Sequence, residues 1–253
     1  MTRQARKKSA SGIYHIMMRG INRQTIFEDQ DDYTKFLQTL KQYKEISGYQ
    51  IYAYCLMGNH VHLLLKVGEE PLEQVMRRIC GSYVYWYNWK YQRIGNLFQD
   101  RFKSETIEND SYFLTALRYI HQNPLKAGLV KNIKDYQWSS ISEYINRSEL
   151  IDNNFALEMF DADREKAVQS FIQFCKTVSD DQCLEMEDKR LLSDPEAKDL
   201  IKKVCQVKNA LDLQKLDRAM RNEYLKQLKE EYHLSIRQIE RLTGVNRGVI
   251  FNA

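Results

Sequence analysis

The sequence has little of several residue types and patterns, and each shortage excludes a class of protein. Only 3 Pro and 10 Gly occur in 253 residues, which excludes a collagen-like chain and argues against disorder. No apolar run approaches the ~20 residues of a membrane-spanning helix. The basic N-terminal residues are not followed by the apolar stretch of a secretory signal. The five cysteines form no C-x-x-C pair, so neither a zinc knuckle nor a disulfide framework is indicated. These shortages favour a globular, cytoplasmic protein with no membrane partner.

The charge is distributed unevenly along the chain. The net charge is +4. Residues 1–150 hold 21 Lys and Arg against 15 Asp and Glu, a net +6, whereas the remainder holds 17 against 19, a net −2. The first part is therefore the better candidate for binding a polyanion.

Apolar periodicity predicts alternating strands and helices over roughly the first 145 residues. The predicted elements are a strand over 12–21, a helix over 31–48, strands over 49–57 and 60–67, a helix over 71–95, a strand over 96–108 and a helix over 110–123. Pro71 and Gly95 limit the second helix. Asp110 is the candidate N-cap of the third helix, and Pro124 ends it. This β-α-β-β-α-β order predicts an α+β fold with a ferredoxin-like (RRM-like) antiparallel sheet and packed helices.

Beyond Tyr144 the strand patterns end and polar residues become frequent. We therefore expect a first domain over residues 1–148 and a smaller, all-α C-terminal domain over 149–253.

Two histidines occupy one apolar strand, in the stretch "MGNHVHLLLKV". Because side chains alternate along a strand, His60 and His62 are expected on one face and Val61 on the other. One interpretation is a packed, hydrogen-bonded pair. The other is half of a metal site, because neutral imidazole is a common ligand of divalent metals.

Tyr119 and Asn123 lie four residues apart on the predicted helix "LTALRYIHQN", and so share one face of it. An amide oxygen is an ordinary ligand for Mg²⁺ or Mn²⁺. If this helix covers the histidine face, then His60, His62 and Asn123 could bind a metal beside the Tyr119 phenol, which could attack a phosphodiester. The alternative for Tyr119 is a tyrosine packed on the sheet. Tyr112, seven residues earlier, shares roughly the same face but has Ala116 at its own i+4 position.

The pairing of "MGNHVHLLL" with "RYIHQNPLKAGLV" some sixty residues later resembles the single-tyrosine HUH transposases, most closely the REP-associated tyrosine transposases and their relatives. The resemblance covers roughly residues 8–145. It implies an RRM-like fold, Tyr119 as the nucleophile, and His60, His62 and Asn123 as ligands of Mg²⁺ or Mn²⁺. It also implies hairpin-bearing single-stranded DNA as the substrate and a 5′-phosphotyrosine intermediate.

A DNA partner gives meaning to other residues. Arg101 and Lys103 alternate onto one face of the predicted strand 96–108 and could contact phosphates. The stretch "SYVYWYNWKY" is rich in aromatic side chains, which could stack on unpaired bases or pack against the sheet.

The chain's last residues, about 221–253, have the pattern of a helix-turn-helix. Ser235 would cap a first helix, Gly244 would lie in the turn, and Asn246 would begin a second helix carrying Arg247 as an early recognition residue. The pattern weakly resembles the DNA-binding end of bacterial replication initiators. An ordinary helical hairpin is the alternative.

Together these patterns predict metal-dependent cleavage and rejoining of single-stranded DNA, with the C-terminal part helping to select or hold the site. A non-catalytic DNA-binding or regulatory protein of the same fold is the alternative. An RNA-binding module of the RRM kind is disfavoured because its aromatic signature is not visible. Whether the chain forms a homodimer is left open.

Overall fold

The structure is a computed structural model that describes residues 6–177, 179, 183–184, 192–232 and 234–253. The chain divides into two compact units, residues 1–186 and 187–253. Across the described residues, every helix is too short or too polar to cross a membrane.

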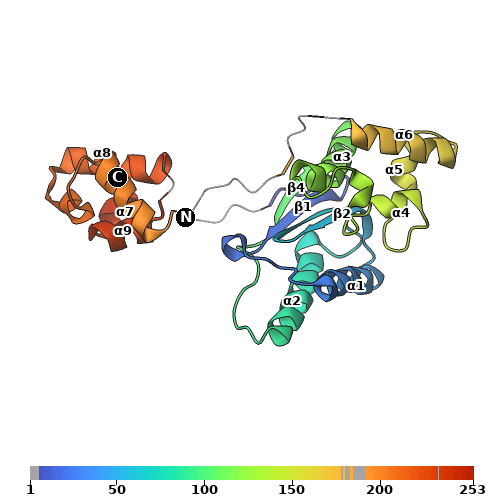
Figure 1. Cartoon of the computed structure of the whole chain (residues 1–253), viewed down its shortest axis with the longest axis horizontal. Coiled ribbons are helices and arrows are strands. Elements are labelled where there is room, and N and C mark those ends of the chain that lie inside the picture. The colour runs from blue at the N-terminus through green and yellow to red at the C-terminus, as the bar shows by residue number, and fades with distance from the viewer. Residues whose placement is uncertain (1–5, 178, 180–182, 185–191, 233) are drawn as a thin grey trace. The chain divides into compact units, whose positions relative to one another are not determined.

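A four-stranded antiparallel sheet lies at the centre of the first unit (Figure 1). Its strands are β1 (Ile13–Arg19), β2 (Gln50–Met57), β3 (His60–Lys66) and β4 (Lys103–Ile107), in the spatial order β2-β3-β1-β4. The two-residue turn Gly58–Asn59 joins β2 to β3, so that Met57 pairs with His60. A mixed α and β architecture with an antiparallel sheet is thus confirmed.

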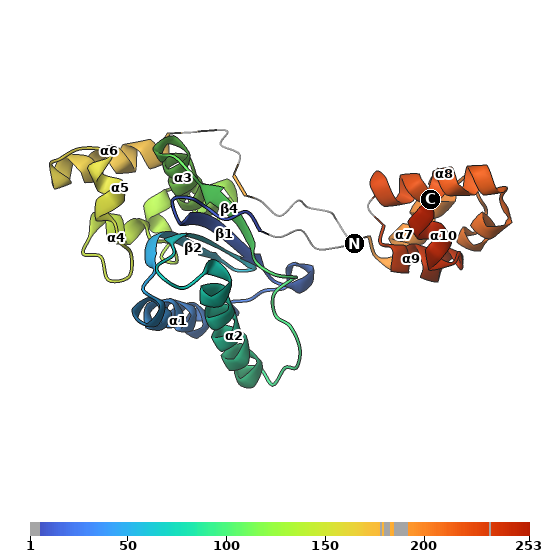
Figure 2. The same ribbon diagram turned by 180° about the vertical axis from the view of Figure 1, so that it is seen from behind.

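Long helices cover both faces of this sheet. Helices α1 (Gln30–Ser47) and α2 (Leu72–Lys90) lie on one face, and α3 (Asp110–Lys126) lies on the other (Figures 1 and 2). Alternation along β1 serves both layers: Met18 contacts Cys80 of α2, their sulfur atoms 3.2 Å apart, whereas His15 contacts Tyr119 of α3. The two faces of the sheet therefore carry different chemistry.

The predicted limits of α2 and α3 are wrong in three places. Helix α2 ends at Lys90 rather than at Gly95. Helix α3 continues through Pro124 to Lys126, because a proline in the last turn removes only one backbone donor and Ala127 N still donates to Asn123 O at 2.9 Å. Its N-cap is Asn109 rather than Asp110, since the Asn109 side chain accepts the Tyr112 N–H at 2.8 Å.

The predicted strand over 96–108 is also interrupted. Only Lys103–Ile107 form β4, while Leu97 O and Gln99 N hydrogen-bond to the chain at the end of β1. Asp100 separates these two parts because its φ of 54° is incompatible with a strand.

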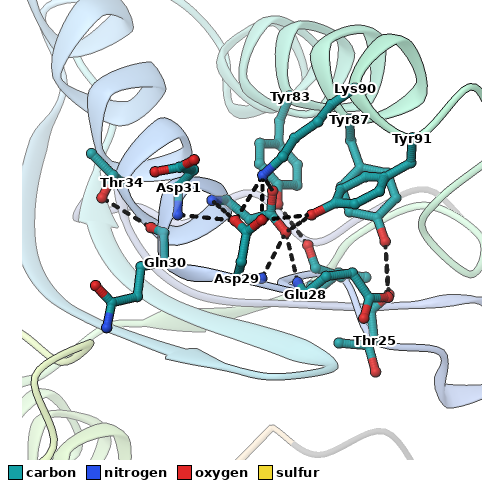
Figure 3. Close-up of polar contacts among 12 residues, drawn as sticks. Thr25, Glu28, Asp29, Gln30, Asp31, Thr34, Tyr83, Tyr87, Lys90 and Tyr91 are labelled. Atoms are coloured by element: carbon teal, nitrogen blue, oxygen red, sulfur yellow. Dashed lines mark hydrogen bonds and ion pairs between the residues drawn. The ribbon is translucent and has the colours of Figure 1, made fainter.

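A buried carboxylate joins the start of α1 to the end of α2. Asp32, which is 0% exposed, accepts hydrogen bonds from the backbone N–H groups of Glu28 (2.6 Å) and Asp29 (3.2 Å). It also accepts from Lys90 Nζ (2.8 Å) and Tyr91 Oη (2.9 Å). Figure 3 shows Lys90, the last residue of α2, and Tyr91, which follows it, pointing towards Asp29. The first turn of α1 is thereby fixed against the last turn of α2.

The predicted domain boundary at 148/149 is wrong, because the first unit extends well beyond it. Residues 138–152 cover the outer edge of β2: Leu56 N donates to Trp138 O (2.9 Å) and Asp152 N to Ile51 O (2.6 Å). Helix α6 (Arg164–Lys176) completes the same core, with the Phe171 ring stacked on Tyr144 at 4.1 Å. The other helices described in this unit are short: η1 (Ile21–Arg23), η2 (Ile133–Asp135), α4 (Ile141–Ile145) and α5 (Asn154–Glu158).

The second unit has its own apolar core and, in the residues described there, only helices and loops. These are α7 (Asp194–Val204), η3 (Ala210–Lys215), α8 (Arg218–Glu230), α9 (Ile236–Thr243) and α10 (Arg247–Asn252). Ser235 caps α9, Gly244 ends it with a φ of 71°, and Asn246 caps α10. Helices α9 and α10 thus follow one another across the short turn that the sequence predicts.

Candidate active site

The two histidines of β3 lie side by side on the sheet face that α3 covers. Their ring centroids are 5.2 Å apart with an interplanar angle of 86°. His60 is half-buried, and its Nδ1 lies 2.7 Å from Oδ1 of Asn59 in the preceding turn. His62 is 1% exposed. Alternation along the strand predicted this shared face.

A third histidine, His15 of β1, belongs to the same cluster, although the sequence did not single it out. Its Nε2 lies 3.0 Å from Nδ1 of His62, and the two rings stack at 5.2 Å. Burial lowers the pKa of His15 to about 3. The pKa of His62 also lies well below its usual value, through burial first and then through the neighbouring His15 and His60. Both imidazoles are therefore neutral near pH 7, the form in which imidazole binds metals.

The phenol ring of Tyr119 packs against these histidines. Its centroid is 5.6 Å from that of His62 and 5.9 Å from that of His15, both in edge-to-face geometry. Lys126, two turns later on α3, places its Nζ 4.9 Å from the Tyr119 ring centroid. Tyr119 is only 2% exposed. Tyr112, the other candidate tyrosine, interacts with Glu105 of β4, and burial followed by that carboxylate raises its pKa.

Asn123 lies one turn after Tyr119 on the same face of α3. Its Nδ2 donates to Tyr119 O at 2.9 Å, which orients the amide so that Oδ1 would be the atom to ligate a metal. No group of three or more His, Cys, Asp or Glu side chains that could hold a metal ion exists among the described residues. A metal at the histidine pair would therefore need a ligand of another type, and an amide oxygen is one such ligand.

The predicted DNA-contacting residues lie in different places. Arg101 precedes β4 and Lys103 begins it, so the two do not share a strand face, although both line one groove. Arg247 lies at the start of α10 in the second unit, where its guanidinium forms an ion pair with Glu240 of α9.

Comparison with known proteins finds similarity to one family within the first unit. Residues 8–123 match the family described as "Transposase IS200 like". A Haemophilus influenzae protein named as a candidate REP-associated tyrosine transposase is 29% identical over 122 residues, which are 44% of this chain and 69% of that protein. The REP-associated tyrosine transposase of Escherichia coli K12 is 26% identical over 101 residues, 39% of this chain and 58% of that protein.

A solved structure shows the likeness of fold. The structure of a REP-associated tyrosine transposase bound to a REP hairpin superposes with a TM-score of 0.52 at 21% identity, over 58% of this chain and 87% of that one. The matched family segment contains β1, β3 and α3 up to Asn123, and hence every residue of the histidine and tyrosine cluster except Lys126. Residues 8–123 of this chain therefore match the IS200-like transposase family, and over that segment the chain is similar to the REP-associated tyrosine transposases.

Proposed function

We propose that this chain cleaves and rejoins single-stranded DNA through a covalent link between Tyr119 and a 5′ phosphate. The observation that carries the proposal is the packing of the Tyr119 ring against His62 on the sheet face that also carries His60, within a domain of the transposase family. The relative whose structure was solved is bound to a REP hairpin, which supports hairpin-bearing DNA as the partner.

His60, His62 and Asn123 would hold a divalent metal, Mg²⁺ or Mn²⁺. Imidazole nitrogens and an amide oxygen suit such an ion. Each imidazole uses Nδ1 in a hydrogen bond within the chain, so a metal would be ligated through Nε2. For His62 this requires Nδ1–H to donate to His15 Nε2, and His15 would therefore select the ligating tautomer. A bound metal would polarise the scissile phosphate and offset the charge that develops during attack.

The chain's own residues would perform the transfer. The Tyr119 oxygen attacks phosphorus, a P–O bond to tyrosine forms, and the bond from phosphorus to the 3′ oxygen breaks. The phenol loses its proton, and the departing 3′ oxygen gains one. The ammonium of Lys126, 4.9 Å from the Tyr119 ring, would favour the phenolate. Since one phosphodiester replaces another, a 3′ hydroxyl can reverse the step without ATP.

Burial of Tyr119 sets a condition on this proposal. At 2% exposure the residue is covered, so DNA must displace a neighbouring side chain to reach the phenolic oxygen. The same burial favours the second candidate function, a non-catalytic DNA-binding protein that keeps the transposase fold.

The finer features of fold support the same proposal. We assign the first unit's strand order β2-β3-β1-β4 and its β-α-β-β-α-β chain order to the ferredoxin-like (RRM-like) class. We assign α9, the Gly244 turn and α10 to a helix-turn-helix that helps hold duplex DNA, with Arg247 near the contact surface.

The test is incubation of the full chain with labelled, hairpin-flanked single strands and Mn²⁺, followed by denaturing electrophoresis. We expect a covalent protein–DNA band that Tyr119→Phe abolishes, since removal of one hydroxyl leaves the packing nearly unchanged. Tyr112→Phe, on the same helix, is the matched control and should keep the band. Absence of the band from the wild-type chain, with DNA affinity intact, would favour the non-catalytic protein.

A further inference from the structure

A groove of about 1220 Å³ lies on the sheet face opposite the candidate active site. It runs between α2 and the segment 96–104, and Met18 of β1 contributes to it. Met18 contacts Cys80 of α2, while the histidine and tyrosine cluster contacts α3, so the sheet separates the groove from that cluster. Its volume exceeds the ~300–1,000 Å³ typical of a small-molecule pocket, which favours an extended occupant.

The groove combines apolar lining residues with a basic rim. Cys80 and Val84 of α2 lie on one side, Phe98 and Phe102 of the segment 96–104 lie on the other, and all four are partly exposed. Such a surface suits the flat, apolar faces of unpaired bases.

Four cations, Arg6, Arg77, Arg101 and Lys103, line the same groove, against the two carboxylates of Glu73 and Asp100. The Arg6 guanidinium lies over the Phe102 ring, 3.7 Å from its centroid, and donates to Phe102 O at 2.8 Å. The pKa of Arg6 is lowered by burial first and then by the charge of Arg101, so two like charges lie near each other. An anion between them would relieve this repulsion.

Gly81 lies in the middle of α2 and also lines the groove. Glycine destabilises a helix interior relative to alanine. Here the protein itself does not require glycine, because a Cβ at this position would meet no atom within 4 Å. One turn and two turns further along the exposed side of α2 lie Tyr85, 79% exposed, and Trp89, 67% exposed. The helix therefore offers an open strip followed by two exposed rings.

We infer that this groove binds unpaired nucleotides of a DNA strand, with bases against the apolar lining and phosphates on the basic rim. The inference rests on the proposed function for the choice of DNA as the partner. Single-stranded rather than duplex DNA follows from the lining, because a duplex hides its base faces whereas an unpaired strand exposes them. Because Gly81 has no side chain, the DNA strand can then approach the backbone of α2 closely.

The test measures binding of the full chain to fluorescein-labelled oligo(dT) of about 15 nucleotides, the upper range of single-strand site sizes. A blunt hairpin serves as the duplex probe. Anisotropy is recorded in EDTA over a range of salt concentrations, so that no cleavage is needed for the readout. Gly81→Leu should weaken oligo(dT) binding about tenfold, leave blunt-hairpin binding unchanged, and not lower the urea midpoint. Leucine is a good helix former, and its Cβ meets open space.

The charged rim has its own readout. Because each phosphate contact to a single strand contributes a salt slope of about −0.7, the double variant Arg77→Gln with Arg101→Gln should reduce the slope for oligo(dT) by about 1.4. Arg78→Gln is the matched control, since Arg78 is the next residue of α2 but its Nη2 is bonded to Glu70 at 2.8 Å. It should leave oligo(dT) binding and its slope nearly unchanged.

Several outcomes would overturn the inference. One is unchanged oligo(dT) binding by Gly81→Leu, and another is an equal loss on the blunt hairpin. A third is that the wild-type chain self-associates and that Gly81→Leu alters its sedimentation but not its oligo(dT) affinity. The groove would then bind a second copy of the chain. The covalent-adduct assay is independent of these readouts. Loss of oligo(dT) affinity in Gly81→Leu without any wild-type adduct would uphold the groove and reject the proposed catalysis.

Discussion

Replacing Asp32 by Asn should destabilise the first unit by about 3 kcal/mol, the lower end of the ~3–5 kcal/mol for breaking a buried ion pair. Asp32 is 0% exposed and accepts from two backbone N–H groups, Lys90 and Tyr91. The substitution keeps the shape but removes the charge and turns one acceptor oxygen into a donor facing other donors. We use the low end because Lys90 is about one-fifth exposed and also binds Asp29 at 2.7 Å.

The assay is urea unfolding of the full chain followed by tryptophan fluorescence. The three tryptophans, Trp86, Trp89 and Trp138, all lie in the first unit, so the signal reports that unit alone. With a urea m-value of about 2 kcal/mol/M, a loss of 3 kcal/mol moves the midpoint by about 1.5 M.

Asp31→Asn is the matched control for this prediction, because Asp31 lies in the same first turn of α1 but is exposed. This substitution should remove only the interaction of the carboxylate with the helix dipole, about 0.3–1 kcal/mol. Equal midpoints for the two variants would refute the assignment of Asp32 as the link between α1 and α2. The double variant with Lys90→Met should be non-additive by about 1–3 kcal/mol, since the two side chains share one network.

Three further predictions concern the remaining parts of the structure. His15→Phe should keep the ring shape but weaken Mn²⁺ binding about 10- to 100-fold by calorimetric titration, and unchanged affinity would show that His15 does not orient His62. Lys126→Met should slow adduct formation about 2- to 30-fold at saturating DNA, and an unaltered rate would remove Lys126 from the mechanism. Gly244→Ala should lower the helical content of the second unit by circular dichroism, because φ is 71° and a Cβ would lie 2.1 Å from Gln214 Nε2; native helicity would contradict this.

Local sequence rules predicted the parts of the site that depend on one element at a time. The two-residue period of a strand places His60 beside His62, and the i, i+4 spacing of a helix places Asn123 one turn after Tyr119. Gly244 likewise ends α9, because its left-handed backbone conformation favours glycine, which has no Cβ. Each of these features requires knowledge of only a few neighbouring residues.

Features that depend on distant pairing could not be predicted in the same way. His15 meets His62 only because β1 and β3 pair in the register that sets Met17 opposite His62. The first unit extends past residue 148 because residues 138–152 form backbone hydrogen bonds with the outer edge of β2. The composition of residues 138–152 does not indicate that they pair with this strand.

The central strand β1 explains how one small sheet could separate two tasks. Its side chains alternate, so that His15 points towards α3 and Met18, three positions later, points towards α2. On the α3 face the buried histidines are held neutral, as metal ligation requires. On the α2 face the groove is open and basic, as capture of a strand requires. Cations that attract DNA keep their charge most easily where water solvates them, whereas burial favours the neutral form of imidazole. Placing the two on opposite sides of a sheet lets each face keep its own environment.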